Sequence, residues 1–196
     1  MSSALSIDRD RRLWLGAASI AGAGGLAASA VPFVATLAPS EKSRAEAGPV
    51  DIELTGLRAG ELRTVEWRGR PVFVFLRSPA MLEALTGHDE LLADPASRRS
   101  AQPAFARNVH RSARPGIAVF EGLCTHLGCV PGFRPRAGSP DLGISWPGGF
   151  FCPCHGSKFD LAGRVFKNMP APTNLAVPPY RFTADAVLRI GVEAEG

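Results

Sequence analysis

The chain reads Cys124-Thr-His-Leu-Gly-Cys129 at residues 124–129 and Cys152-Pro-Cys-His-Gly-Ser157 at residues 152–157, and these two stretches organise everything around them. They contain all four cysteines of the protein and two of its four histidines. The first stretch offers Cys-x-His and the second Cys-x-x-His, and each has one further cysteine. The pattern indicates a metal centre shared by two loops.

The residue types alone allow three interpretations of these loops. A tetrahedral zinc ion would use four of the six side chains, although zinc knuckles usually place two cysteines two or more residues apart. A two-iron cluster would also use four, with two thiolates on one iron and two imidazoles on the other. The two remaining cysteines could then form a disulfide between the loops. The third interpretation is a pair of ordinary disulfides beside two histidines that bind nothing.

The paired motifs C-T-H-x-G-C and C-P-C-H-G-S resemble those of the Rieske iron–sulfur proteins. The resemblance implies a 2Fe-2S cluster as the cofactor. Thiolates then hold one iron and imidazoles hold the other, which gives the ligands Cys124, Cys152, His126 and His155. The resemblance also implies that Cys129 and Cys154 form the disulfide.

The same resemblance implies roles for the residues around the cluster, which are Ser157, Leu127, Gly128, Gly156, Phe159 and Pro170. Ser157 would donate a hydrogen bond to a bridging sulfide, and Leu127 would cap the exposed tip. The segment 169–172 resembles a proline loop that covers a third side of the cluster. High-potential members of the family have a tyrosine where this chain has Phe159. Because donors to sulfur stabilise the reduced state, we expect a somewhat lower potential here.

Composition favours strands and turns over a helical bundle. The 196 residues are 45% hydrophobic, which allows a core, and they include 17 Pro and 21 Gly. The net charge is +4. Five arginines concentrate in a Pro/Ser/Ala-rich segment that lacks an aromatic pattern between them, so we expect a solvated surface and no nucleic-acid partner. These arginines are Arg98, Arg99, Arg107, Arg111 and Arg114.

The N-terminal region resembles an export signal followed by a membrane anchor. Arg11 and Arg12 precede apolar residues, as in twin-arginine signals. Residues 13–40 contain no charged residue, and about 20 apolar residues suffice to cross a bilayer. Small residues at 28–30 would also suit a cleavage site, but apolar residues continue beyond them, which favours an uncleaved anchor.

The predicted organisation follows from this anchor. Residues 1–12 form a cytoplasmic N-terminus, 13–38 a transmembrane helix and 39–50 a polar flexible hinge. Residues 51–196 form a periplasmic head. The protein is thus expected in the bacterial inner membrane, with a single span.

The head is predicted to be all-β. Alternating or continuous apolar residues indicate strands at 51–54, 62–67, 71–76, 117–120 and 187–190, with a strand-like stretch at 144–146. Short helices are expected between Pro79 and Leu92, with Ser78 as the cap. His88 is expected at the surface. The predicted fold is a Rieske-type antiparallel β sandwich with a cluster-binding subdomain inserted at about 122–170, preceded by one transmembrane helix.

The function implied by the resemblance is that of the iron–sulfur subunit of a bacterial ubiquinol–cytochrome c reductase, the cytochrome bc complex. The subunit would accept an electron from ubiquinol beside the cytochrome b subunit, with His155 contacting the quinol, and pass it to the cytochrome c haem subunit. Proton release would be coupled through the ligand histidine, and the complex would be dimeric. The enzyme is the assembly. The alternative is the Rieske subunit of another exported oxidoreductase, such as arsenite oxidase.

Overall fold

A computed structural model describes residues 3–40 and 48–192 of the chain. The chain divides into two compact units, Met1–Ala45 and Glu46–Gly196. The predicted hinge at 39–50 falls largely on residues 41–47, which lie outside the described residues. The boundaries predicted for the cytoplasmic segment, the anchor and the hinge therefore remain predictions.

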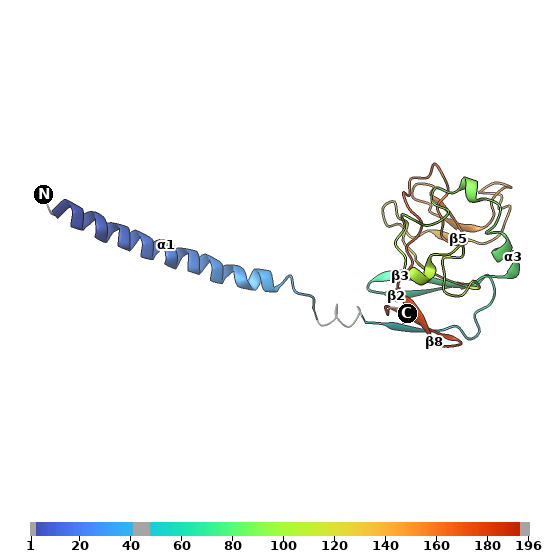
Figure 1. Cartoon of the computed structure of the whole chain (residues 1–196), viewed down its shortest axis with the longest axis horizontal. Helices are drawn as coiled ribbons and strands as arrows, with labels where there is room; N and C mark the ends of the chain where they lie inside the picture. Colours follow the sequence, from blue (N-terminus) through green and yellow to red (C-terminus); the bar gives the residue numbers. More distant parts are fainter. Residues whose placement is uncertain (1–2, 41–47, 193–196) are drawn as a thin grey trace. The chain divides into compact units, whose positions relative to one another are not determined.

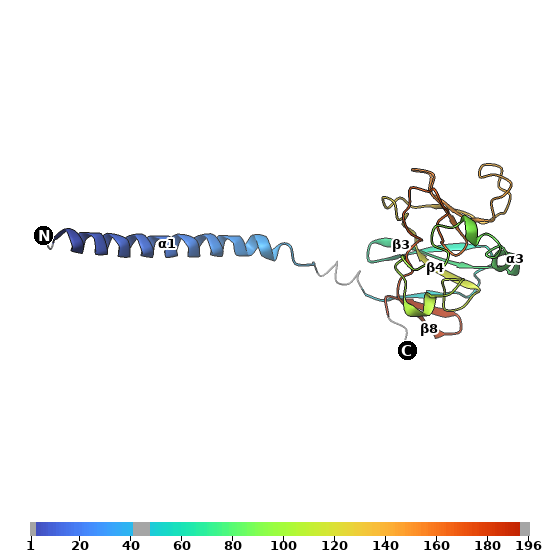
Figure 2. The same ribbon diagram turned by 45° about the horizontal axis from the view of Figure 1, so that its top comes forward.

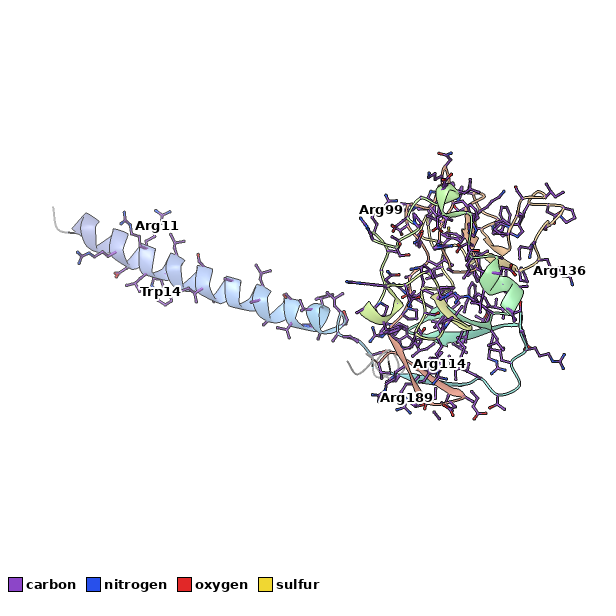
Figure 3. The ribbon with its side chains drawn as sticks, turned by 45° about the vertical axis from the view of Figure 1, so that its right-hand side comes forward. Arg11, Trp14, Arg99, Arg114, Arg136 and Arg189 are labelled. Atoms are coloured by element: carbon purple, nitrogen blue, oxygen red, sulfur yellow. A yellow bond between two sulfur atoms is a disulfide. The ribbon has the colours of Figure 1, made fainter. Side chains whose placement is uncertain are left out.

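Within its described residues the first unit contains one long helix, α1 (Ser3–Ala35). Its residues Arg9–Ala35 are long and apolar enough to cross a membrane. The helix begins at Ser3, before the two arginines of the predicted export signal, and Figure 3 shows Arg11 and Trp14 projecting from it. The prediction of one N-terminal apolar helix is confirmed.

The second unit, which we call the head, consists of strands joined by long loops (Figure 1). Within its described residues it contains three antiparallel sheets of three strands each. The first has the order β1-β9-β8, and its strands are β1 (Val50–Glu53), β9 (Val187–Ile190) and β8 (Tyr180–Ala184). The second has the order β2-β3-β4, with β2 (Leu62–Trp67), β3 (Arg70–Leu76) and β4 (Ile117–Glu121). The third has the order β5-β6-β7, with β5 (Gly132–Arg134), β6 (Gly149–Phe151) and β7 (Lys158–Asp160).

The third sheet lies within the inserted subdomain. Figure 2 shows the loops of this subdomain at the end of the head opposite β8. The predicted all-β antiparallel fold with an inserted subdomain is confirmed by these sheets.

Five of the six strands in the first two sheets lie where the sequence predicts them, and β8 was not predicted. The continuous apolar run in β3 is buried from Val72 to Phe75, because β3 is the central strand of its sheet. β2 alternates more, as expected for an outer strand. The helix prediction is also confirmed: α3 (Pro79–Glu83) follows Ser78, whose hydroxyl accepts a hydrogen bond from the Met81 N–H at 3.2 Å. Two 3-10 helices follow, η1 (Asp89–Leu91) and η2 (Ala104–Ala106).

The strand expected at 144–146 is wrong. These residues lie in turns of the loop between β5 and β6, and Ile144 is 97% exposed. Three alternating residues between Gly143 and Pro147 were too short a pattern to distinguish a strand from a turn. For the same reason the three-residue strands β5, β6 and β7 were not predicted.

A single hydrophobic core joins the three sheets. Phe150 of β6 stacks on Phe73 of β3, with ring centroids 5.5 Å apart, and meets Phe75 edge to face at 5.8 Å. Cys124 and Cys152 belong to the same core. The core, which includes Phe73 and Phe75 of the second sheet, therefore supports both cysteine loops.

Candidate metal centre

The two loops, which we call loop 1 (124–129) and loop 2 (152–157), have the same backbone hydrogen-bond pattern. In loop 1 the Cys124 N–H donates to the Cys129 carbonyl at 2.8 Å, and the Gly128 N–H donates to the Cys124 carbonyl at 2.9 Å. Loop 2 repeats both bonds, from Cys152 to the Ser157 carbonyl and from Gly156 to the Cys152 carbonyl, at the same two distances.

The glycine in each loop closes the turn. Gly128 and Gly156 both have φ of +79°, a left-handed conformation that other residues adopt at a cost. Strand pairing places both loops at the same end of the third sheet. Loop 1 lies just before β5 and loop 2 directly follows β6, and Gly132 at the start of β5 pairs with Phe151 at the end of β6. The fold thus brings all six cysteine and histidine side chains of the motifs to one end of the subdomain.

Thiols and imidazoles lie at different depths in this site. Cys124 and Cys152 are free thiols with exposures of 3% and 2%, whereas His126 is half-buried and His155 is exposed. The two imidazoles meet edge to face with centroids 4.8 Å apart. Two buried thiols behind two adjacent surface imidazoles are the donor set that a mixed Cys/His 2Fe-2S cluster requires, so these residues fit that group.

Cys129 and Cys154 form a disulfide between the loops, with their Cα atoms 6.7 Å apart. The sulfurs of Cys129, Cys152 and Cys154 lie within 4.8 Å of one another. This group is not a three-thiolate site, because the disulfide occupies two of the sulfurs. Instead the disulfide lies against the Cys152 thiol and links the two loops directly.

The proline loop at 169–172 is attached to both cysteine loops. The Ala171 N–H donates to the Ser157 hydroxyl at 3.1 Å, and Ser157 is fully buried. The Thr125 hydroxyl in loop 1 donates to the Thr173 carbonyl at 2.6 Å. Sequence reasoning missed Thr125, although it lies within the first motif, because nothing local indicated its partner 48 residues away.

Burial raises the pKa of the Cys124 thiol. Desolvation raises the pKa of Cys124, and this effect outweighs the hydrogen bond from the His126 backbone; the neighbouring Cys152 thiol raises it further. The Ser157 hydroxyl lies within hydrogen-bonding reach of Cys124 and acts in the opposite direction. A thiol of this kind keeps its proton in the metal-free protein, so metal binding must displace that proton.

Directly after loop 2, Asp160 anchors a buried ionic network. Its Oδ2 accepts from Arg164 Nε at 2.7 Å and lies 3.2 Å from His88 Nε2. Its Oδ1 accepts from the backbone N–H groups of Ala162 and Arg164, both at 2.8 Å. Burial alone would raise the pKa of Asp160, but His88, the Arg164 charge and these N–H donors lower it. The Asp160 carboxylate thus stabilises the turn that leaves the site.

The expected surface position of His88 is wrong. Its side chain is only 10% exposed, it contacts Asp160, and it stacks on Phe166 with centroids 5.9 Å apart. The partner lies 72 residues further along the chain, so the local sequence did not indicate this burial.

The basic segment is also not uniformly solvated as expected, because Arg111 is fully buried. Its guanidinium donates to the carbonyls of Ala162 and Leu175, at 3.1 and 2.7 Å. Arg77, likewise buried, donates to the carbonyls of Leu161, His110 and Pro115. Burial lowers the pKa of each arginine to about 10, so both stay charged at neutral pH. Together they hold the chain around 161–163 behind the site.

The remaining predicted site residues divide into a buried and an exposed set. Phe159 is fully buried in β7 and belongs to the core. Leu127 in loop 1 is 73% exposed, and Val130, which directly follows loop 1 and was not predicted as a site residue, is 53% exposed. Pro170 is exposed in the proline loop. The tip therefore presents apolar side chains next to the two imidazoles.

Comparisons with known proteins agree with this geometry. Residues 50–180 match the family described as "Rieske [2Fe-2S] domain". The chain is 50% identical over 181 residues to the "Ubiquinol-cytochrome c reductase iron-sulfur subunit" of Allochromatium vinosum, covering 92% of this chain and 87% of the relative. It is 39% identical to the protein of the same name from Blastochloris viridis, covering 97% and 98%.

A solved structure titled "Hyperthermophilic respiratory Complex III" is also similar. It is 22% identical, with a TM-score of 0.44, and the match covers 89% of this chain and 97% of that one. The family assignment rests on the sequence matches.

Proposed function

This chain belongs to the Rieske [2Fe-2S] family, and from that premise we propose that it is the iron–sulfur subunit of a ubiquinol–cytochrome c reductase. The observation that carries the proposal is the 50% identity, over most of both chains, to a relative that bears this name. As a family member it binds a 2Fe-2S cluster and serves electron transfer. The quinol substrate, the ligands and the partner subunits are the proposal.

Cys124 and Cys152 hold one iron in this proposal, and His126 and His155 hold the other. The support is the separation of two buried free thiols from two surface imidazoles. When bound, a cluster with two neutral imidazole ligands accepts one electron more readily than an all-thiolate cluster, at potentials of roughly −150 to +300 mV.

The residues around the ligands adjust that potential. Ser157 accepts a hydrogen bond from the Ala171 N–H, which leaves its own O–H proton available for a sulfur acceptor. A donor of this kind favours the more negative reduced state. Phe159 has no hydroxyl to add a second donor. Gly128 and Gly156 shape the loops around the cluster, and Pro170 covers its side.

Quinol oxidation requires a group that accepts a proton where the electron leaves. With one ring nitrogen on iron, the exposed imidazole of His155 would keep its other nitrogen free to accept the hydrogen bond from the quinol hydroxyl and then its proton. Leu127, exposed beside the imidazoles, provides an apolar surface against the quinol ring. The proton is later released to the aqueous side, where it contributes to the proton gradient.

The proposed location follows from α1. Residues 13–38 anchor the protein in the bacterial inner membrane, 1–12 remain in the cytoplasm with the twin-arginine signal, and 51–196 form the periplasmic head. The segment 39–50 acts as a hinge. The head thereby alternates between the cytochrome b subunit, where ubiquinol binds, and the cytochrome c haem subunit, within a dimeric complex. In this proposal the complete complex, and not this subunit alone, catalyses the oxidation of ubiquinol.

A gene-replacement experiment tests this function. Deleting the gene should abolish ubiquinol-dependent reduction of cytochrome c by isolated membranes, and reintroducing it should restore the activity. Reintroduced His155→Ala, which lacks a proposed iron ligand, should not restore it, whereas Arg136→Gln, an exposed change in another loop, should. Unchanged ubiquinol oxidation after deletion would refute the proposal. Loss of arsenite-dependent electron transfer instead would favour the arsenite oxidase alternative.

A further inference from the structure

The five arginines of the basic segment separate into different environments. Arg111 is buried, and Arg114 lies 4.0 Å from the carboxylate of Asp185. Arg98 and Arg107 are exposed, and both line one pocket on the head surface. Neither the electron-transfer site nor the disulfide involves this pocket.

The pocket has a volume of about 290 Å³, near the lower end of the range of roughly 300–1,000 Å³ for small-ligand sites. Its lining is mostly polar or charged and consists of Ala96, Ser97, Arg98, Ser100, Gln102 and Arg107. A small concave site of this composition suits a compact polar group rather than an apolar ligand.

The carboxylate of Asp94 accepts hydrogen bonds from the segment 98–100 that follows it. Asp94 is buried, and its two oxygens accept from the backbone N–H groups of Arg98 and Arg99, each at 2.9 Å. The Ser100 hydroxyl donates to the same carboxylate at 3.3 Å. Burial opposes the negative charge of Asp94, but these donors outweigh it and lower the pKa. Asp94 therefore holds the backbone of this segment in place through three donors of the segment itself.

The uncharged polar walls of the pocket are held from the inside. Gln102 donates to the Ser97 carbonyl at 3.0 Å and accepts from Arg111 Nε at 2.9 Å. The Ser97 hydroxyl accepts from Asn174 at 2.7 Å, and Ser97 itself has a left-handed φ of +51°. The first bond joins two residues of the pocket wall, and the other two connect that wall to the buried side chains of Arg111 and Asn174, so the wall is preorganised.

The side chains of Arg98 and Arg107 are not held by such hydrogen bonds from the described residues. Within residues 3–40 and 48–192, no hydrogen bond or ion pair engages the guanidinium group of Arg98 or Arg107. Two charged groups with planar donor forks thus line a preorganised polar pocket whose lining, among the described residues, contains no carboxylate. The arrangement is electropositive and rich in donors, which is the chemistry that recognises an oxyanion.

We propose that this pocket binds a phosphate-type oxyanion, with Arg98 and Arg107 as its charged ligands. Guanidinium forks pair with phosphate oxygens through two parallel hydrogen bonds, and such charge-assisted bonds are stronger than neutral ones. The same chemistry has two sources, free inorganic phosphate and the phosphodiester of a lipid headgroup. The second source is present in any membrane that the apolar helix α1 would span.

Calorimetric titration of the full-length protein with its cluster, in a neutral detergent at constant ionic strength, tests this site. The two probes are inorganic phosphate and glycerophosphoglycerol, a soluble phosphodiester headgroup. Wild type should bind at least one probe saturably. Arg98→Gln and Arg107→Gln should each weaken binding about tenfold or more, because each removes a charge-assisted contact.

Arg136→Gln is the matched control, since Arg136 is also exposed and Figure 3 shows it on the side of the head away from Arg99. It should leave binding unchanged. A second measurement needs no variant: phosphate should slow the reaction of Arg107 with phenylglyoxal in the wild-type protein, followed by mass spectrometry, and should not slow that of Arg136.

Tighter binding of glycerophosphoglycerol would identify a lipid headgroup as the source, and tighter binding of phosphate would identify the free ion; both support the site. Three results would overturn it. These are no saturable binding of either probe, an equal loss in Arg136→Gln, and equal protection of both arginines from phenylglyoxal.

Discussion

The backbone N–H of Ala171 donates to the buried hydroxyl of Ser157 at 3.1 Å and so joins the proline loop to loop 2. Because this bond uses an acceptor position of the hydroxyl, the O–H proton remains free to face the sulfur of Cys124, which lies within its reach. One side chain thus links the structural role of the proline loop to the redox chemistry of the site.

Replacing Ser157 by alanine should therefore change two properties. The cluster potential should fall, because a hydrogen bond to a charged group contributes about 1.5–3 kcal/mol and about 1.4 kcal/mol corresponds to 59 mV for one electron. The free energy of unfolding should fall by about 1–3 kcal/mol, because the Ala171 N–H loses its partner. Redox titration by EPR and urea unfolding measure the two changes. Ser145→Ala, at an exposed serine, should alter neither. An unchanged potential in Ser157→Ala would contradict the donor role.

Phe159→Tyr should raise the cluster potential. Phe159 is fully buried in β7, and the family resemblance places a tyrosine hydroxyl at this position within reach of the first ligand cysteine. The added donor would stabilise the reduced state. Redox titration of both proteins at the same pH measures the shift. A potential equal to or below that of the wild type would show that the hydroxyl does not reach a sulfur.

Cys129→Ser should reduce both stability and iron content. The disulfide joins residues 25 apart in sequence, and chain entropy for a loop of this size contributes roughly 3–4 kcal/mol. It also lies against Cys152, so its loss should loosen loop 2. Iron analysis and the thermal unfolding midpoint are the measurements, with Val130→Ala beside it as the control. Full iron occupancy with an unchanged midpoint would refute a stabilising role.

Asp160 should make stability depend on acid pH. Its pKa in the folded state lies below the unfolded value of about 3.9, so its contribution is complete above that value and is lost as pH falls through the folded pKa. Asp160→Asn should lower the free energy of unfolding by about 3–5 kcal/mol at pH 7, because Arg164 loses a buried partner. It should also weaken the acid dependence below about pH 5.

Urea unfolding at several pH values measures this effect. Asp185→Asn provides the control, since the Asp185 side chain is fully exposed and lies 4.0 Å from Arg114. Its unfolding free energy should match that of the wild type at every pH. Identical acid profiles for Asp160→Asn and the wild type would show that the buried network contributes no linked stability.

The local sequence predicted the longer strands, the start of α3 and the residues of the two cysteine motifs. The run at 62–67 became β2 because its apolar residues alternate, and the run at 71–76 became β3 because its continuous apolar residues suit a buried central strand. Ser78 and Pro79 began α3 as capping rules indicate. The motif residues could be identified because thiols and imidazoles at these spacings have few other uses.

Long-range pairing accounts for what could not be predicted. The sequence pattern of Arg111 is that of a surface arginine, yet two of its acceptors are carbonyls 51 and 64 residues away. His88 is likewise buried by a carboxylate 72 residues away. The strands β5 to β7 are too short for any period, and they exist because they pair with each other on the aromatic core.

The most direct test of the central claim is the low-temperature EPR spectrum of the full-length protein after reduction with ascorbate. A cluster held by two cysteines and two histidines should be reduced by this mild donor and give a Rieske-type signal. A signal obtained only with dithionite would indicate a low-potential carrier and contradict the role in quinol oxidation. No signal, with zinc in the purified protein, would contradict the proposed ligand assignment itself.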